Sequence, residues 1–324
     1  MKEYVSIQGE KVCLFHFAVN FIEYNLLIKY GIKLKYTAFR RFLNCLDKIA
    51  LINGGDGFSD IYGSHMFLSR LNYAHLAMKA NIPLIFLPQP IGPFSLGPDR
   101  DLAIKILKYS SEIFVRDKMF ICDLDELGVN YEISKDLSAF MKPESFDIII
   151  EKNAVGINFS GLAYDNGYMD LAGKFPTYKM FVHQLIINFQ KYGIPIYLIP
   201  HSYNYKTPEK FNDDFSACKN AYNQLDDKSN VYVVDKDLIS PQVKYVISKM
   251  SFFIGTRMHA NFAAIYTNVP VFGLSYSYKF AGAFEANGLS ASQTLSIVNM
   301  SEKHISDAIM TIDSFYKQSL EKNV

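Results

Sequence analysis

The chain has 324 residues, of which 49% are apolar and 20% are charged, as in a soluble globular protein with two domains. Its net charge of +1 argues against a nucleic-acid-binding groove. The four scattered cysteines form no CxxC or Cys/His cluster, which argues against disulfide, zinc and iron–sulfur scaffolds. Charges near the N-terminus and the lack of a long apolar run predict neither a signal peptide nor an integral membrane segment. We therefore expect a cytoplasmic protein without a metal site.

Short apolar runs alternate with amphipathic stretches along the whole chain, a pattern typical of parallel sheets covered by helices. The first half predicts strands over 11–17, 48–53, 83–88 and 112–117, and helices near 36–46, 64–80, 99–110 and 117–127. For the second half, the predicted strands are 154–160, 195–200, 230–235, 251–255 and 269–274. Its predicted helices lie near 177–192, 208–225, 240–249, 258–267, 278–287 and 301–322.

Residues 142–154 mix charge, proline and a short apolar patch, which is typical of a domain boundary. We place two α/β domains at 1–148 and 149–324, each Rossmann-like and doubly wound. Such sheets bind ligands beyond the carboxyl ends of their strands. The loops that follow the predicted strands are therefore the candidate sites.

The loop after the strand at 48–53 combines glycines with polar side chains. Gly54 and Gly55 allow a ligand to approach the backbone closely. Asp56, Ser59 and Asp60 supply oxygens for hydroxyl recognition or base catalysis. The alternative is a glycine turn with a helix cap.

Two further loops of the first half carry one polar candidate each. Gln89 is the only side-chain hydrogen-bonding group in a proline-rich loop, which is either a ligand contact or a structural corner. Arg116 ends the next strand and is either an anion clamp or half of an ordinary Asp–Arg pair.

In the second half, Ser160 and Gly161 follow a strand directly, where their N–H groups could bind an anion. His201 stands at the end of the next strand, as a ligand contact or as a capped, solvated residue. We count all three as candidate substrate-binding residues.

Arg257 and His259 occupy a corner between a buried strand and a helix. Free N–H groups and the helix dipole favour an anion there. A guanidinium and a titratable imidazole at that corner can hold a phosphate or carboxylate and move a proton beside it. The alternative is a salt-bridged corner with a core imidazole.

The loop after the last predicted strand adds three hydroxyls and one ammonium, from Ser275, Tyr276, Ser277 and Lys279. So many polar side chains in one loop indicate substrate binding rather than a simple turn.

The stretch IGTRMHANFAAIYTNVPVFGLSYSYKFAG resembles the C-terminal signature of the polysaccharide pyruvyl transferase family. The blocks GGDGFSDIYG, LPQPIGPF, FVRD, INFSGLAY and PHSYN are similar to further parts of the family pattern, in the same order. The resemblance extends from about residue 48 to residue 288.

The resemblance implies a glycosyltransferase-B-like arrangement of two Rossmann-like domains. It implies transfer of a pyruvyl group from phosphoenolpyruvate to two hydroxyls of a saccharide, as a ketal, in cell-surface polysaccharide biosynthesis, with no metal or redox cofactor. Arg257 and His259 correspond to the donor-site pair, with His259 as the candidate acid and Asp60 as a candidate base. Asp60, Arg116, Ser160 and Lys279 match family positions more loosely. The acceptor would be a saccharide or a lipid-linked oligosaccharide, which is compatible with peripheral contact at the inner face of a membrane.

Residues 1–47 depart from the family pattern, because they lack a strand followed by a Gly-x-x-Asn-x-Gly-Asp-type loop. We therefore expect the first βα unit to be atypical or missing. Two alternatives stay open on the sequence alone: a nucleotide-sugar glycosyltransferase of the same architecture, and a non-catalytic, saccharide-binding derivative of the transferase.

Overall fold

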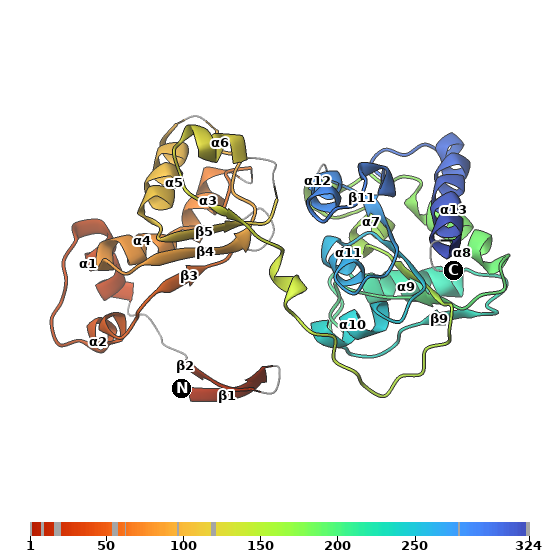
Figure 1. Cartoon of the computed structure of the whole chain (residues 1–324), viewed down its shortest axis with the longest axis horizontal. Helices are drawn as coiled ribbons and strands as arrows, with labels where there is room; N and C mark the ends of the chain where they lie inside the picture. Colours follow the sequence, from red (N-terminus) through yellow and green to blue (C-terminus); the bar gives the residue numbers. More distant parts are fainter. Residues whose placement is uncertain are drawn as a thin grey trace. The chain divides into compact units, whose positions relative to one another are not determined.

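The computed structural model describes residues 2–7, 10–15, 21–53, 58–61, 63–95, 97–117, 121–277 and 279–321. The chain divides into two compact units, Met1–Leu137 and Ser138–Val324 (Figure 1). Each unit is built around its own parallel sheet, as the alternating pattern predicts.

The division at 137/138 lies earlier in the chain than the expected boundary at 148/149, because the segment before residue 149 packs on the second unit. The ammonium of buried Lys244 donates to the carbonyls of Ser138 and Met141, both at 2.7 Å. Phe146 and Ile148 pack against a core cluster of that unit. The charged residues and proline of this stretch therefore belong to a segment that packs on the second unit and not to a free linker.

The second unit has a six-stranded parallel sheet in the order β12-β11-β10-β7-β8-β9. Its strands are β7 (Val155–Asn158), β8 (Ile196–Leu198), β9 (Val231–Val233), β10 (Phe252–Gly255), β11 (Val271–Ser275) and β12 (Thr294–Ser296). The chain winds outward from β7 on one side and from β10 on the other. This doubly wound order confirms the Rossmann-like prediction and places a topological switch point between β7 and β10.

Helices cover both faces of this sheet (Figure 1). One core cluster contains side chains of α7 (Gly161–Asp165), α8 (Tyr178–Gln190), α9 (Asp214–Asn223) and α13 (Ile305–Glu321). The other contains side chains of α10 (Ser240–Ile247), α11 (Met258–Ile265) and α12 (Lys279–Ala286). Four short 3-10 turns accompany them, at Leu137–Ala139, Met169–Leu171, Ala291–Gln293 and Glu302–His304.

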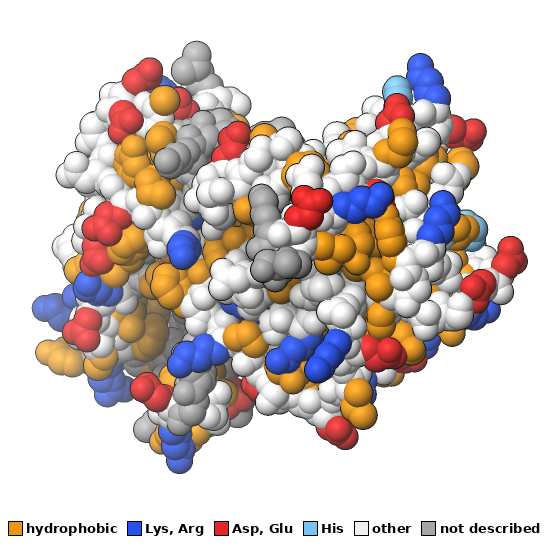
Figure 2. Space-filling view, turned by 45° about the vertical axis from the view of Figure 1, so that its right-hand side comes forward, with side chains coloured by type: hydrophobic (Ala, Val, Ile, Leu, Met, Phe, Trp, Pro, Cys, Tyr) orange, Lys and Arg blue, Asp and Glu red, His pale blue; other side chains and the backbone are white. Residues whose placement is uncertain are grey.

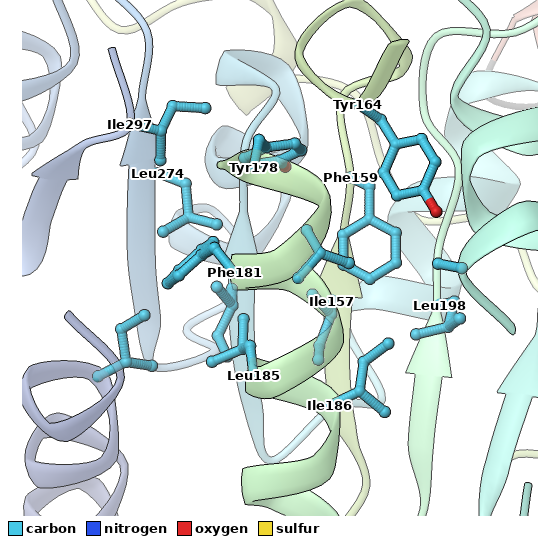
Figure 3. Packing of buried hydrophobic residues seen from close by; sticks show 14 of the residues in the cluster. Ile157, Phe159, Tyr164, Tyr178, Phe181, Leu185, Ile186, Leu198, Leu274 and Ile297 are labelled. Carbon is cyan, nitrogen blue, oxygen red and sulfur yellow. The ribbon is translucent and has the colours of Figure 1, made fainter. Parts of the chain in front are cut away.

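Successive strand residues of the second unit pack alternately into the two core clusters. In β10, Phe252 and Ile254 enter one cluster and Phe253 enters the other, and all three are at most 2% exposed. Figure 3 shows Phe181 and Leu185 of α8 lying over the first of these cores. Burial of each such side chain contributes about 1.5–3 kcal/mol. The switch point therefore stands on a rigid, doubly covered sheet.

The first unit has a four-stranded parallel sheet whose strands follow the chain in sequential order. They are β3 (Ile49–Leu51), β4 (Leu84–Gln89), β5 (Glu112–Val115) and β6 (Glu132–Ile133). The helices that pack on it are α3 (Ser64–Arg70), α4 (Asn72–Ala80), α5 (Pro98–Tyr109) and α6 (Ile121–Glu126).

Only one face of this smaller sheet is fully covered by the described helices. In β4, Leu84 and Phe86 are buried, whereas Ile85 and Leu87 on the opposite face are partly exposed. Sequential right-handed crossovers place successive helices on the same face, which accounts for the asymmetry. The doubly wound order is thus a property of the second unit in the part of the chain that the structure describes.

The N-terminal segment differs from the rest of the first unit. The hairpin of β1 (Lys2–Ile7) and β2 (Glu10–Phe15) is antiparallel and separate from the parallel sheet, and α1 (Phe21–Tyr30) and α2 (Ala38–Asn44) follow it. The strand expected at 11–17 therefore exists, but it pairs with β1. Among the described residues, β3 is the first strand of the parallel sheet.

Candidate functional site

A buried carboxylate, that of Asp214, lies at the centre of the switch point. Asp214 is the first residue of α9 and its side chain is fully buried. Its Oδ1 accepts hydrogen bonds from Arg257 Nη2 at 2.7 Å and from Arg257 Nε at 3.1 Å. This two-nitrogen contact is the strong, geometrically specific form of an ion pair.

The same carboxylate also binds backbone N–H groups from two other loops. Gly161 donates to Oδ1 at 2.8 Å, and Ser202 and His201 donate to Oδ2 at 2.9 and 3.3 Å. Asp214 therefore ties together the loops that follow β7, β8 and β10. The sequence analysis missed Asp214, although the two adjacent aspartates at the start of the helix were a signal. Asp213 alone serves as the N-cap, accepting from Ser216 N at 2.8 Å, so the second carboxylate is left for another role.

Arg257 is held on several sides. Its side chain is 12% exposed, its Nη2 also donates to Asn212 Oδ1 at 2.8 Å, and its backbone N–H donates to Asn158 Oδ1 at 2.9 Å. Burial lowers the pKa of Arg257, but Asp214 and Tyr276 raise it by more, so the group stays cationic. The alternative interpretation, a salt-bridged corner, is confirmed for this arginine. Its charge is largely compensated inside the protein.

The two histidines of the site have different environments. His259, in the first turn of α11, is exposed, so it is not the core imidazole of the alternative interpretation. Its ring lies edge-on to that of Phe262, with the ring centroids 5.8 Å apart. His201 is partly exposed. Burial lowers the pKa of His201 against the opposing charge of Asp214, and with the smaller effects of the nearby His259 and Arg257 charges the pKa falls to about 4. His201 is thus neutral at pH 7 and lies within electrostatic reach of both His259 and Arg257.

Small polar residues complete the floor of the switch point. Ser160 is fully buried, and its hydroxyl has no hydrogen-bond partner among the described residues. Next to it, a Cβ on Gly161 would lie 2.4 Å from the Asp213 carbonyl oxygen, so only glycine fits. The hydroxyls of Tyr178 and Thr256 are hydrogen-bonded at 2.7 Å, and burial raises the pKa of Tyr178.

The loop after β11 brings fewer polar side chains to the candidate site than its composition suggests. The Ser275 hydroxyl donates to the Ser277 carbonyl at 2.8 Å and so closes the turn. Tyr276 packs on Phe175, with ring centroids 6.5 Å apart, and interacts with Arg257. The side chain of Lys279 lies outside the described part of the structure.

In the first unit, the structure gives Gln89 a structural role in place of the expected substrate contact. Its side chain is 1% exposed. Its Oε1 accepts from Asn53 N at 2.9 Å, and its Nε2 donates to the carbonyls of Leu51 at 2.9 Å and Leu87 at 3.1 Å. The amide therefore joins the ends of β3 and β4, as the structural-corner alternative predicts.

Asp60 and Arg116 are also engaged within the first unit. Asp60 Oδ2 accepts from Ser95 N at 2.6 Å, which ties the loop after β3 to the loop after β4. Arg116 Nη1 contacts Asp136 Oδ2 at 2.5 Å, and both side chains are mostly buried, so the ordinary Asp–Arg pair is confirmed. Ser59 is buried at 1% exposure. Gly54, Gly55 and Asp56 lie outside the described residues.

The described residues therefore bring together one group of the predicted site residues: Ser160, Gly161, His201, Arg257, His259 and Tyr276. They contain no cluster of three or more His, Cys, Asp or Glu side chains that could hold a metal ion. No helix in the described ranges has the length and apolar content needed to cross a bilayer. The site combines a compensated guanidinium, two imidazoles and backbone donors, which suits an anionic ligand and proton transfer.

The solved structures that resemble this chain include two enzymes of trehalose-phosphate synthesis. One is an α,α-trehalose-phosphate synthase (UDP-forming) from Burkholderia vietnamiensis, with 10% identity and a TM-score of 0.43 over 94% of this chain and 76% of that chain. The other is a trehalose-6-phosphate synthase, OtsA, with 13% identity and a TM-score of 0.44 over 99% of this chain and 84% of that chain. TM-scores below 0.5 are too low to support an argument about domain arrangement or function.

A search of curated protein sequences finds no match. The sequence model of the family described as polysaccharide pyruvyl transferase matches residues 7–278, most of the chain and all of the switch-point residues described above. The chain therefore belongs to the polysaccharide pyruvyl transferase family.

Proposed function

We propose that this protein transfers a pyruvyl group from phosphoenolpyruvate to two hydroxyls of a saccharide, forming a ketal, in the biosynthesis of a cell-surface polysaccharide. The observation that carries the proposal is the exposed imidazole of His259 at the start of α11, next to the Arg257 guanidinium at the switch point. Family membership supports the same reaction class.

The donor has a phosphate and a carboxylate, so its site needs cations and N–H donors. The first N–H groups of α11 have no partner within the helix and point toward the end where His259 lies. His259 lies exposed at this end of the helix, where a protonated imidazole would add a positive charge. We infer that the phosphate or carboxylate of the donor binds at this end of α11, with Arg257 beneath it.

The reaction needs one proton on carbon and the loss of two protons from oxygen. His259 gives a proton to the methylene carbon of phosphoenolpyruvate, which becomes a methyl group, and a sugar oxygen bonds to the neighbouring carbon. The C–O bond to phosphate then breaks, and the second sugar oxygen takes its place on the same carbon. One hydroxyl proton replaces the one given by His259, and the other leaves with the phosphate. The donor itself supplies the leaving group, so no redox cofactor is required.

Two residues are candidates for the base that accepts the hydroxyl proton. The first is Asp60, the carboxylate that the sequence offers for this role, whose Oδ2 also accepts a hydrogen bond from Ser95 N. The switch point offers His201, which is neutral at pH 7 because burial lowers its pKa to about 4. Replacing each in turn, as Asp60→Asn and His201→Gln, would separate the two.

Non-catalytic saccharide binding is a second candidate function. Two observations favour it: the antiparallel hairpin that precedes the first parallel strand, and the compensation of the Arg257 charge by Asp214. It predicts binding of saccharide without release of phosphate.

The test is to incubate the full chain with phosphoenolpyruvate and a panel of saccharides. The proposal predicts release of inorganic phosphate together with the mass gain of one pyruvyl ketal on the sugar. His259→Ala should lower the rate about 10²–10⁴-fold, the contribution of a general acid. The matched control is His304→Ala, an exposed histidine that contacts Ser301. Full activity of His259→Ala would contradict the assignment, and turnover of a nucleotide sugar instead of phosphoenolpyruvate would contradict the proposed reaction.

A further inference from the structure

Residues 21–41 of the first unit form a surface with an unusual number of exposed large apolar side chains. They are Phe21, Ile22, Tyr30, Ile32, Leu34 and Tyr36, with exposed fractions of 78%, 69%, 71%, 47%, 40% and 91%. Exposed apolar side chains gathered in one segment mark an interaction site more often than the same side chains scattered singly over a surface.

The segment is anchored to the unit by other residues. Leu27 of α1 is 3% exposed and packs with Phe39 and Leu43 of α2 and with Leu76 of α4. The exposed side chains therefore belong to a segment whose other side packs into the core of the unit. Gly31, whose φ of +67° disfavours residues with a side chain, ends α1 and leads into the exposed stretch 32–36.

Charge separates this surface from the rest of the chain. Residues 21–41 contain five basic residues and one acidic residue, Lys29, Lys33, Lys35, Arg40 and Arg41 against Glu23. The segment thus carries +4, whereas the whole chain carries +1, which leaves −3 on all other residues. Over the face shown in Figure 2, basic, acidic and hydrophobic side chains are intermixed.

We propose that residues 21–41 bind the surface of an anionic lipid bilayer. Aromatic and aliphatic side chains interleaved with lysines are the composition of interfacial membrane-binding segments, because the rings enter the headgroup region while the ammonium groups attract anionic lipids. Protein–protein interfaces are instead depleted of lysine, and nucleic-acid grooves do not need exposed isoleucine and leucine. The inference is independent of the proposed reaction, although it would bring the protein close to saccharides carried on lipids.

The test is flotation of the full chain with vesicles. The proposal predicts binding to phosphatidylcholine vesicles that contain phosphatidylglycerol, weaker binding to pure phosphatidylcholine, and loss of the preference at high salt. Each lysine near an anionic surface counts for about a fivefold change in partitioning. The triple variant Lys29→Ser, Lys33→Ser, Lys35→Ser should therefore bind about a hundredfold more weakly.

A second triple variant, Ile32→Ser, Leu34→Ser, Tyr36→Ser, tests the apolar contribution and should weaken binding to both vesicle types while the preference for phosphatidylglycerol remains. The matched control is Met310→Ser with Leu320→Ser on α13, whose side chains are 57% and 43% exposed and should not affect binding. Unchanged thermal unfolding shows that the variants fold. Equal binding to both vesicle types, or equal loss in the control, would overturn the proposal. So would a concentration-dependent dimer that the apolar variant abolishes and that binds no vesicles, because the surface would then serve a second copy.

Discussion

The polar residues that follow strands have different roles in the two units. In the second unit, side chains and N–H groups from the loops after β7, β8 and β10 converge on Asp214, and histidines remain beside them. In the first unit, Gln89, Asp60 and Arg116 each close a separate local contact. Polar residues that follow strands thus form one shared site in the second unit and separate local contacts in the first.

The difference follows from the topology of the sheets. Strand order reverses at β7 and β10, so the chain leaves a crevice at their carboxyl ends that side chains can share. The described strands of the first unit run in sequential order, and the loop after β3 pairs with the loop after β4 through Phe58 and Ile91. A polar residue after a strand is therefore better evidence of function when it lies at a reversal of the strand order.

The largest expected effect that tests this comparison is the loss of stability on replacing Asp214. Asp214→Ala leaves the mostly buried Arg257 guanidinium without its carboxylate and frees three backbone N–H groups, so we expect a loss of about 3–5 kcal/mol in the free energy of unfolding of the second unit. Chemical denaturation measures it. The control Asp226→Ala, at an exposed position, should change little. Similar losses in the two variants would mean that Asp214 does not organise the site.

The next effect belongs to the first unit. Gln89→Met removes the amide that bridges β3 and β4 and leaves the Asn53 N–H and the Leu51 carbonyl without it, which should cost about 1–3 kcal/mol of stability. The rate per folded molecule should stay unchanged, because the amide is buried. Loss of transfer activity at unchanged stability would restore Gln89 as a substrate contact and weaken the contrast between the units.

The pH dependence of stability tests the environment of His201. Burial lowers its pKa from 6.5 to about 4 in the folded chain. Between these values the unfolded chain binds a proton that the folded chain does not, so stability should fall as the pH is lowered from about 6.5 toward 4. His201→Gln should flatten this part of the profile, measured by denaturation at several pH values. An identical slope in the variant would show that another group dominates.

The smallest effect concerns an exposed ion pair of the first unit. Lys48 and Glu112 lie 2.7 Å apart, with side chains 54% and 42% exposed. Solvent screens such pairs, so Lys48→Met should change the stability by less than about 1 kcal/mol. A loss of stability as large as that expected for Asp214→Ala would contradict the distinction between buried and exposed ion pairs.

The sequence predicted the central strands of the second unit well because they are buried on both faces. An uninterrupted apolar run such as 251–255 has few alternatives to a central strand, and β10 occupies Phe252–Gly255. The described strands it missed carry no such run. In β1 (Lys2–Ile7) charged and polar residues stand among the apolar ones, β6 has two exposed residues, Glu132 and Ile133, and β12 is a short edge strand at Thr294–Ser296. Local patterns do not reveal strands of this kind.

The site was predicted less completely than the fold, because its central contact joins distant parts of the chain. Arg257 and Asp214 are 43 residues apart, and nothing in the spacing of Arg257 and His259 shows whether the guanidinium faces a ligand or a carboxylate. The identity of the strand-end loops was predictable from topology. The way their side chains are paired was not.

The central claim is that phosphoenolpyruvate binds at the switch point of the second unit, with His259 in contact with it. Isothermal titration calorimetry of phosphoenolpyruvate into the full chain tests this directly, with His259→Ala and His304→Ala compared under the same conditions. We predict that the wild-type chain and His304→Ala bind the donor alike and that His259→Ala binds it at least tenfold more weakly, the loss of about 1.4 kcal/mol expected for one charged contact. Equal affinities in all three chains, or no binding to the wild type, would contradict the account.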